Sequence, residues 1–576
     1  MSDESLFSIT IGGQAGQGIK SSGLTLAKVA SRSGYRVHTY TEFPSLIRGG
    51  HNVIQILVSP KEVSAPVKHI HLLIALNQDT INRHRAELSS GGGVIYDSDK
   101  KIDTSFFDPG LINLFPVPLS KFANTAGSSE LLVNTVSIAA AVALLGGDAK
   151  ILETLIREEF ADKGEAVINS NLTAIQSGFE YAKANFNDKI KSVLAPVSNP
   201  SPHMIVNGAE AIALGAIAGG LQFSAIYPMS PASNILSTLA LYQEQYGYIY
   251  KQPEDEISAV GMCIGAGFAG ARALTATSGG GFSLMVESLG LAAMTETPLV
   301  IVEGMRPGPA TGLPTWNAQG DLQFVLHAHQ GDFPRIVLAA GCAQEAFDLT
   351  IQALNLADKY QTPVILLVDK NILDDDWSVS PFDVSGYLID RGKLTADFNP
   401  EFTRYAPEAD GVSYRSIPGT GNFFIANSDE HNASGFSSED VTDIVSQQTK
   451  RMTKLKTCAD TEMPPPQIFG PENADVTLVS WGSNKGSILS ALESFPQANY
   501  LHLTWMNPFP AEAVKTILNS AKRVISIEAN YSGQLAKLIA EKTGFLIQDQ
   551  LLKFDGRPIY PEEIITKLNS ILSAKT

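Results

Sequence analysis

SLFSITIGGQAGQGIKSSGLTLAKVASRSG, residues 5–34, is the stretch that decides the fold class of this chain. Its apolar opening predicts a strand, and the helical spacing after residue 18 predicts a helix. Between the two lies a glycine loop, GGQAGQG, at residues 12–18. A strand that turns through glycines directly into a helix is typical of α/β proteins with parallel sheets.

The glycine loop suits a ligand that carries a phosphate or pyrophosphate group. Glycines such as Gly13, Gly16 and Gly18 let the backbone approach an anion, and the following helix supplies free N–H groups at its N-terminus. The spacing differs from the dinucleotide motif GxGxxG, and no Lys-Ser/Thr pair follows it, which excludes a P-loop. A tight turn without a ligand is the alternative.

A second loop is predicted at EFPSLIRGGHN, residues 42–52, which follows an apolar run. Loops at the carboxyl ends of strands are where open α/β sheets bind their ligands. Arg48 in this loop could meet a phosphate or the carboxylate of a partner. An ordinary surface arginine is the alternative.

Strand-like runs alternate with Ala-rich helical patterns along most of the 576 residues. A single hydrophobic core serves about 250–300 residues, so this chain is too long for one core. We therefore predict an α/β protein with three α/β domains. The first spans residues 1–185, a linker with three prolines covers 186–203, the second domain spans 204–460, and the third spans 461–576. Residues 380–440, rich in Gly, Ser, Asp and Asn, predict a long excursion from the second domain.

Composition excludes several classes of protein. The formal charge is −17, with 42 Lys+Arg against 59 Asp+Glu, and no basic run is present, so nucleic acid is not an expected partner. Cys263, Cys342 and Cys458 form no CxxC pair, which argues against a zinc site or an iron–sulfur cluster in this chain. The acidic N-terminus and the lack of an apolar run of about 20 residues predict a cytoplasmic protein that does not enter a membrane.

The second domain contains two turns with candidate binding groups. In YPMSPAS, residues 227–233, two prolines fix a turn and leave the Ser230 hydroxyl at its tip, where it can donate to a carboxylate or carbonyl. The glycine turn, Ser278 to Gly281, leaves room for a flat ligand or for the backbone of a neighbouring subunit. A plain rigid turn is the alternative reading of both.

Two charged groups of the second domain have more specific interpretations. Glu256 lies where the apolar helical stretch begins, so it could be buried, with a pKa shaped by desolvation; acids in a first helical turn are also expected from the helix dipole alone. Arg306 lies in GMRPGPATGLPT, residues 304–315, a loop stiffened by Pro and Gly. Such a loop suits the presentation of a guanidinium to a substrate carboxylate, and Thr315 could add a hydroxyl donor.

Taken in order, these motifs resemble the alpha subunit of 2-oxoacid:ferredoxin oxidoreductases, of the 2-oxoglutarate type with a gamma domain fused at its N-terminus. GGQAGQG and EFPSLIRGGHN resemble the gamma domain. YPMSPAS, EDEISA, ATSGGGFSLM and RPGPATGLPT resemble the pyrimidine-binding domain. WMNPFP, IEANYSGQL and KFDGRPIYPEEI resemble the domain similar to the transketolase C-terminal domain. The resemblance covers nearly the whole sequence.

The resemblance implies a binding site for thiamine diphosphate in the second domain. Glu256 would contact the aminopyrimidine ring and favour the tautomer whose imino group removes the thiazolium proton. Tyr227, Pro228, Ser278 and Gly279 would border the same cofactor. Gly280 stands where the family motif TSGPGF has proline, which loosens the turn.

The resemblance also implies the substrate contacts. Ser230 replaces the Thr of the family's YPITPSS motif and would contact the 2-oxoacid, which Arg306 and Thr315 would hold. The Gly13–Gly18 loop and Arg48 would lie near the path of coenzyme A. The reaction would be the reversible oxidative decarboxylation of a 2-oxoacid to acyl-coenzyme A and CO2, with reduction of ferredoxin. The fused gamma domain favours 2-oxoglutarate, and pyruvate or broad specificity is the alternative.

Features that the sequence lacks imply a partner. The thiamine-enzyme motif GDG with a following Asn is not found, and the resemblance places the Mg²⁺, the diphosphate site and a 4Fe-4S cluster on a separate beta subunit. We expect a dimer of alpha–beta heterodimers that is inactive without the beta subunit. Ferredoxin would dock on that subunit, because a chain of charge −17 repels an acidic protein. The rival interpretations are an NAD-dependent oxidoreductase that uses the glycine loop, and a scaffold subunit without catalysis.

Overall fold

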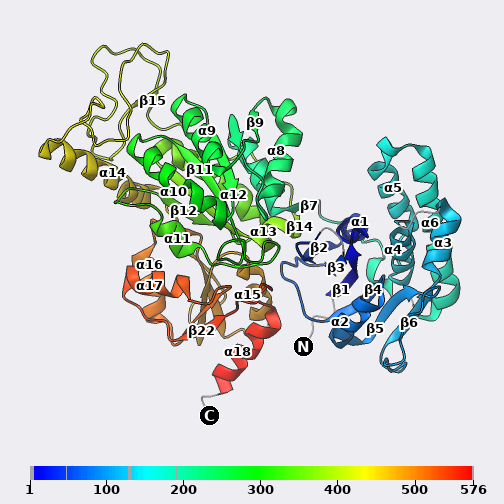
Figure 1. Cartoon of the computed structure of the whole chain (residues 1–576). Helices are drawn as coiled ribbons and strands as arrows, with labels where there is room; N and C mark the ends of the chain where they lie inside the picture. The colour runs from blue at the N-terminus through cyan, green and yellow to red at the C-terminus, as the bar shows by residue number, and fades with distance from the viewer. Residues whose placement is uncertain (1–5, 47–48, 128–130, 190, 574–576) are drawn as a thin grey trace. The chain divides into compact units, whose positions relative to one another are not determined.

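The computed structural model describes residues 6–46, 49–127, 131–189 and 191–573. The chain forms two compact units (Figure 1). Unit 1 comprises residues 1–206, 375–381 and 560–566, and unit 2 comprises the remainder. Both units are α/β, as the sequence predicts. The division into three domains stays a prediction.

The sheet of unit 1 has eight strands in the order β6-β5-β4-β1-β3-β2-β14-β7. The strands are β1 Phe7–Ala15, β2 Arg36–Glu42, β3 Gly49–Ser59, β4 Ile70–Ala75, β5 Leu88–Asp97, β6 Asn113–Val117, β7 Met204–Asn207 and β14 Asp376–Val379. Strands β1, β4, β5 and β6 are parallel to one another, as predicted. Strand β3 is antiparallel to both β1 and β2, which departs from the prediction. The connection from β2 to β3 is too short for the crossover that parallel strands require.

In the described residues up to 186, the helices of this unit are α1 Ile19–Arg32, α2 Gln78–His84, α3 Leu119–Gly127, α4 Leu132–Leu144, α5 Ala149–Glu159 and α6 Glu165–Phe186. Helix α4 is apolar along nearly its whole length and is buried, since α6 packs along it. At their crossing a Cβ on Gly178 would clash with the Val136 carbonyl oxygen, so glycine is required there. Among the described residues that follow α6, the predicted linker contains the short turns η3 Asn187–Lys189 and η4 Ser192–Leu194.

The larger sheet of unit 2 has seven strands in the order β20-β12-β13-β11-β10-β8-β9. They are β8 Phe223–Ala225, β9 Ile249–Lys251, β10 Ala273–Thr277, β11 Leu299–Met305, β12 Ile336–Ala339, β13 Pro363–Asp369 and β20 Trp505–Asn507. All are parallel except β20, which is antiparallel to β12. The helices are α7 Gly208–Ala218, α8 Ser233–Tyr246, α9 Glu256–Phe268, α10 Gly279–Met294, α11 Leu322–His327, α12 Ala343–Tyr360 and α13 Lys370–Asp374.

A second sheet of unit 2 is built by the C-terminal part of the chain, in the order β17-β19-β18-β21-β22. Its strands are β17 Gln467–Phe469, β18 Val476–Ser480, β19 Ala498–His502, β21 Val524–Glu528 and β22 Asp549–Leu552. The helices of this part are α15 Asn484–Leu492, α16 Ala511–Ser520, α17 Gln534–Thr543 and α18 Pro561–Ser573. The same C-terminal part also supplies β20 to the larger sheet, so the two sheets share one folded unit.

The predicted excursion contains, as regular structure, the short strands β15 Leu394–Thr395 and β16 Arg415–Ser416, and the helix α14 Val441–Thr461 follows it (Figure 1). Buried ion pairs fasten it to unit 2. Asp358 on α12, which is 1% exposed, contacts Arg272, Arg391 and Arg415. Since a buried charge is costly unless it is paired, these contacts fix the path of the excursion.

None of the helices in the described part of the chain is long and apolar enough to cross a membrane.

Candidate active site

The predicted site residues of unit 2 gather at the carboxyl ends of four neighbouring strands. Residues 227–230 follow β8, the α9 N-terminus follows β9, Ser278 follows β10, and Arg306 follows β11. Strands β9, β8, β10 and β11 are adjacent and parallel, so their carboxyl ends share one edge of the sheet. Ligands of open α/β sheets bind at this edge.

Glu256 is the first residue of α9 and is buried, with 3% of its surface exposed. Asp255 caps the helix by accepting a hydrogen bond from the Ser258 N–H at 2.8 Å. Glu256 Oε1 has no hydrogen-bond partner among the described residues. Burial raises the pKa of the Glu256 carboxyl, and the negative charge of Asp255 raises it further. Glu256 is therefore an acid held in an apolar setting, ready to exchange a hydrogen bond with a ligand.

The glycine turn packs directly against this acid. A Cβ on Gly281 would lie 2.5 Å from Glu256 Oε1 and would clash with Thr277 Oγ1. Gly281 therefore makes room for a side chain of this chain, whereas the sequence suggested room for a ligand or a neighbouring subunit. Gly280 has open space, with the Met229 Sδ at 3.8 Å as the nearest atom. The buried Ser278 Oγ has no hydrogen-bond partner in the described part of the chain.

Ser230 and Arg306 come together from distant parts of the sequence. Arg306 Nη1 donates a hydrogen bond of 2.7 Å to the Ser230 carbonyl oxygen. Ser230 is exposed on its turn, and this bond does not use its hydroxyl. Tyr227 and Pro228 lie on the same turn.

A buried pair of carboxyl groups beside Arg306 was not predicted from the sequence. Glu303 on β11 is fully buried, and its carboxyl group lies close to that of Asp321, the residue that precedes α11. Burial raises the pKa of Glu303 well above its usual range, and the adjacent Asp321 raises it further. The carboxylate of Asp321 also lies against Gly279, where a Cβ would be 2.8 Å from Oδ2. The Glu303–Asp321 pair thus joins the Arg306 loop to the glycine turn.

Thr315 lies in the same loop as Arg306 and is 7% exposed. Residues 310–313, between them, are exposed. The part of the loop that is exposed therefore lies between the two predicted substrate residues, and Thr315 itself is buried.

The glycine loop of unit 1 has the strand–turn–helix form that the sequence predicts. Gly16 and Gly18 have positive φ angles of 87° and 71°, which few residues other than glycine adopt. The register pairs Ala15 of β1 with Gly49 of β3, so the first residue of β3 lies beside the glycine loop. Arg48 lies outside the described residues, so the structure does not place it.

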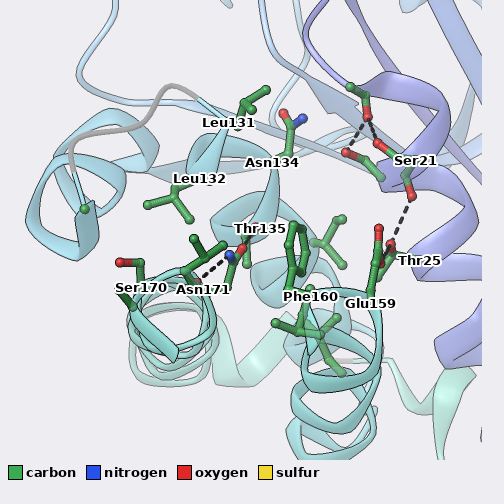
Figure 2. A pocket seen from close by; sticks show the side chains of 18 residues that line it. Ser21, Thr25, Leu131, Leu132, Asn134, Thr135, Glu159, Phe160, Ser170 and Asn171 are labelled. Carbon is green, nitrogen blue, oxygen red and sulfur yellow. Dashed lines mark hydrogen bonds between the residues drawn. The ribbon is translucent and has the colours of Figure 1, made fainter. Parts of the chain in front are cut away.

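Two cavities flank the glycine loop. One, of about 420 Å³, lies between α1, α4, α5 and α6 and is mainly apolar (Figure 2). Figure 2 shows Ser21 and Thr25 on one side of this cavity, with Glu159 and Phe160 facing them. The other cavity, of about 230 Å³, is more polar and is lined by Gly16, Gln17 and Lys100. The smaller cavity offers a cation and a glycine backbone, and the larger cavity offers an apolar lining. Together they suit a ligand with a phosphate end and an apolar arm.

The described residues contain no group of three or more His, Cys, Asp or Glu that could hold a metal ion. Cys263 and Cys458 are buried, and burial raises the pKa of each thiol to about 12. Neither thiol is available as a nucleophile or ligand in this setting.

Comparison with known proteins assigns the chain to a class. Residues 8–181 match the family described as pyruvate ferredoxin/flavodoxin oxidoreductase. Residues 214–450 match the thiamine-diphosphate-binding part of pyruvate flavodoxin/ferredoxin oxidoreductases. The fold and the site thus define an oxidoreductase subunit with a thiamine-diphosphate-binding region.

Relatives over the full length narrow this class. The alpha subunit of a 2-oxoacid:ferredoxin oxidoreductase from a Sulfolobus species is 32% identical, over 98% of this chain and 96% of its own length. The 2-oxoglutarate oxidoreductase subunit KorA of Mycobacterium tuberculosis is 28% identical over 98% and 92%. A solved structure of 2-oxoglutarate:ferredoxin oxidoreductase from Magnetococcus marinus, with 2-oxoglutarate, coenzyme A and succinyl-CoA bound, is 30% identical. It superposes with a TM-score of 0.91 over 99% of this chain and 100% of its own. The chain belongs to the alpha subunits of 2-oxoacid:ferredoxin oxidoreductases.

Proposed function

We propose that this chain is the alpha half of an enzyme that converts 2-oxoglutarate and coenzyme A to succinyl-coenzyme A and CO2 and passes two electrons to ferredoxin. The observation that carries the proposal is the buried Glu256, whose Oε1 lacks a partner in the described chain at the ligand-binding edge of the sheet. It lies on the same edge as Arg306, the cation of the exposed loop. One edge thus offers a proton-holding acid and a carboxylate-binding cation.

The residues at this edge fit thiamine diphosphate. Glu256 holds its proton more tightly than an exposed glutamate, because burial raises its pKa, and it would exchange a hydrogen bond with the aminopyrimidine ring. Tyr227, Pro228, Ser278 and Gly279 would border the ring, and the unpartnered Ser278 Oγ offers a further hydrogen bond. When bound, thiamine diphosphate supplies the carbon nucleophile that attacks a 2-oxoacid.

The substrate would be held by the exposed loop and the neighbouring turn. Arg306 can pair bidentately with a carboxylate, and the Ser230 and Thr315 hydroxyls can donate to the carboxylate or keto oxygen. The preference for 2-oxoglutarate is supported by the bound 2-oxoglutarate in the Magnetococcus marinus enzyme and by the name of the mycobacterial relative. Pyruvate or broad specificity is the alternative.

Coenzyme A would approach through unit 1. The backbone at Gly13, Gly16 and Gly18, with Lys100, would meet its phosphates, and Arg48 is a further candidate. The larger, mainly apolar cavity beside this loop could accept an uncharged part of the molecule.

A partner subunit would complete the enzyme. We infer a beta subunit that holds the diphosphate with Mg²⁺ and a 4Fe-4S cluster and receives ferredoxin, in a dimer of alpha–beta heterodimers. This inference is supported by the three dispersed cysteines, which cannot ligate a cluster together, and by the net charge of −17.

The test is co-expression with the candidate beta subunit, followed by assay of coenzyme A-dependent viologen reduction with 2-oxoglutarate and with pyruvate. Activity above that of either subunit alone is expected, and the ratio of the two rates identifies the substrate. Glu256→Ala should abolish turnover in an intact complex. If that variant keeps full activity, the chain is a scaffold and the proposal is wrong.

A further inference from the structure

The loop that carries Arg306 and Thr315 is held at its far end by the C-terminal part of the chain. The Gln319 N–H donates a backbone hydrogen bond to the Ala529 carbonyl oxygen at 2.8 Å. Asn530 Nδ2 donates to the Gln319 carbonyl oxygen at 3.0 Å. More than two hundred residues separate the partners in sequence and the contact is therefore set by tertiary structure alone.

The Gln319 side chain uses its full hydrogen-bonding capacity. It is completely buried. Its Oε1 accepts from Asn484 Nδ2 at 2.8 Å and from the Ala529 N–H at 3.0 Å. Its Nε2 donates to the Trp481 carbonyl oxygen at 3.0 Å and to Asp369 Oδ2 at 3.2 Å. A buried amide with every donor and acceptor satisfied fixes one position of the backbone, because any shift leaves polar atoms unpaired.

The neighbouring residues of the loop are held in the same way. Gln534 Nε2 donates to the Gly320 carbonyl oxygen at 2.6 Å, and Gln534 Oε1 accepts from the Gln323 N–H at 2.9 Å. The turn that presents these groups is itself rigid, since the buried Glu528 accepts from the Leu535 N–H at 2.7 Å. The IEANYSGQL motif, residues 527–535, thus holds the end of the loop by hydrogen bonds.

The outer side of the loop rests on the DGRP segment. The Asn317 N–H donates to the Gly556 carbonyl oxygen at 2.9 Å. The guanidinium of Arg557 lies 4.2 Å from the centre of the Trp316 ring. A Cβ on Gly556 would lie 3.0 Å from the Trp316 Cβ, and its φ is 85°, so glycine is required there. Trp316, the residue after Thr315, therefore contacts both Gly556 and Arg557 of the C-terminal part of the chain.

We propose that the IEANYSGQL and DGRP segments are a positioning clamp for the substrate loop, with Gln319, Trp316 and Arg557 as positioning residues. The clamp fixes the chain immediately after Thr315 and leaves residues 310–313 exposed. A loop that is held before substrate arrives loses less conformational freedom on binding, which lowers KM. That the loop binds a 2-oxoacid rests on the proposed function; the clamping of the loop does not.

The test uses Arg557→Ala in the full chain, complexed with its partner subunit. Arg557 is exposed, so its loss removes the contact with the Trp316 ring while the fold remains. We expect the KM for the 2-oxoacid to rise about threefold to fivefold, which corresponds to an exposed cation–π contact, with kcat nearly unchanged. Hydrogen exchange of the backbone amides in residues 308–317 should accelerate, with the same melting temperature. Arg557→Lys should recover part of the KM effect.

Two further variants complete the test. Lys522→Ala removes another exposed cation of the C-terminal part, one that pairs with Asp475, and should change neither KM nor exchange. Trp316→Leu combined with Arg557→Ala should be no worse than the more severe single variant, because both act through one contact. Unchanged KM and unchanged exchange in Arg557→Ala would overturn the clamp. If the wild-type complex does not turn over any 2-oxoacid, the proposed function fails, and the exchange rates alone decide the clamp.

Discussion

Replacing Gly281 with alanine should displace the side chain of Glu256 and should change the stability of the fold much less than the activity. The φ angle of Gly281 is not in the left-handed region, so alanine is allowed by the backbone. The obstacle is space, because the new Cβ would clash with Thr277 Oγ1 and would lie 2.6 Å from Glu256 Cγ. Carbon atoms in contact are about 3.5–4.0 Å apart, so the Glu256 side chain must move by about 1 Å.

The two consequences differ in size. A displacement of about 1 Å at a reacting group costs about 100-fold in rate. Overpacking costs about 1–3 kcal/mol of unfolding free energy, and the better helix propensity of alanine returns up to about 1 kcal/mol. We therefore expect kcat of the complex to fall about 100-fold, while the unfolding free energy falls by no more than about 3 kcal/mol.

The assay is viologen reduction by the complex, together with urea unfolding of the isolated chain. Gly280→Ala is the control for stability, since its new Cβ would have only the Met229 side chain nearby, at 3.8 Å. That variant should match or exceed the wild-type stability. Gly281→Ala with kcat within twofold of the wild type would refute the reasoning, because Glu256 would then tolerate displacement or have no part in the reaction.

Three further predictions concern Arg306, His38 and Asp358. Arg306→Lys should raise the KM for the 2-oxoacid about tenfold or more, measured by steady-state kinetics, because lysine cannot form the bidentate pair; an unchanged KM would remove Arg306 from the substrate site. Burial lowers the pKa of His38 to about 3. Below pH 6.5 the unfolded chain therefore binds a proton at this histidine that the folded chain does not bind. The free energy of unfolding, measured with urea, should fall by about 2.5 kcal/mol from pH 6 to pH 4. His38→Phe should reduce this loss, and an identical pH dependence in that variant would contradict the assignment. Asp358→Asn should lower the unfolding free energy by about 3–5 kcal/mol and open residues 382–440 to proteolysis, while Asp460→Asn, in an exposed pair with Lys456, should do neither. If the Asp358→Asn variant resists protease as well as the wild type does, other contacts hold the excursion.

The sequence predicts those features that local pattern determines. The strand, glycine loop and helix of residues 7–32 follow from hydrophobic spacing and from the conformations that glycine allows. The burial of Glu256 follows from its place at the start of an apolar helix. The comparisons confirm the family and the α/β class. The roles of the individual site residues stay predictions.

Other features depend on contacts between distant segments, which periodicity does not encode. Glu303 looks like one more residue of a buried strand until Asp321 is placed beside it. Gln319 is an ordinary loop glutamine in sequence, and its partners lie about fifty to more than two hundred residues away. The reasons for Gly281 are the side chains of Thr277 and of Glu256, which lies on another helix. The antiparallel β3 was also missed, because its apolar run is compatible with either direction.

Under the proposed function, one edge of the sheet serves both an acid and an anionic substrate, and the charges at the strand ends explain how it can. Glu256 has no cation among the groups that shift its pKa, so burial favours its neutral form. Burial raises the pKa of Glu303 and of Asp321, and the charge of Arg306 lowers both pKa values. Because burial is the largest effect on each carboxyl, the pair presents Arg306 with less negative charge than two exposed carboxylates would. The positive charge of Arg306 is therefore not fully balanced by its own chain, which leaves the guanidinium able to attract the carboxylate of a substrate.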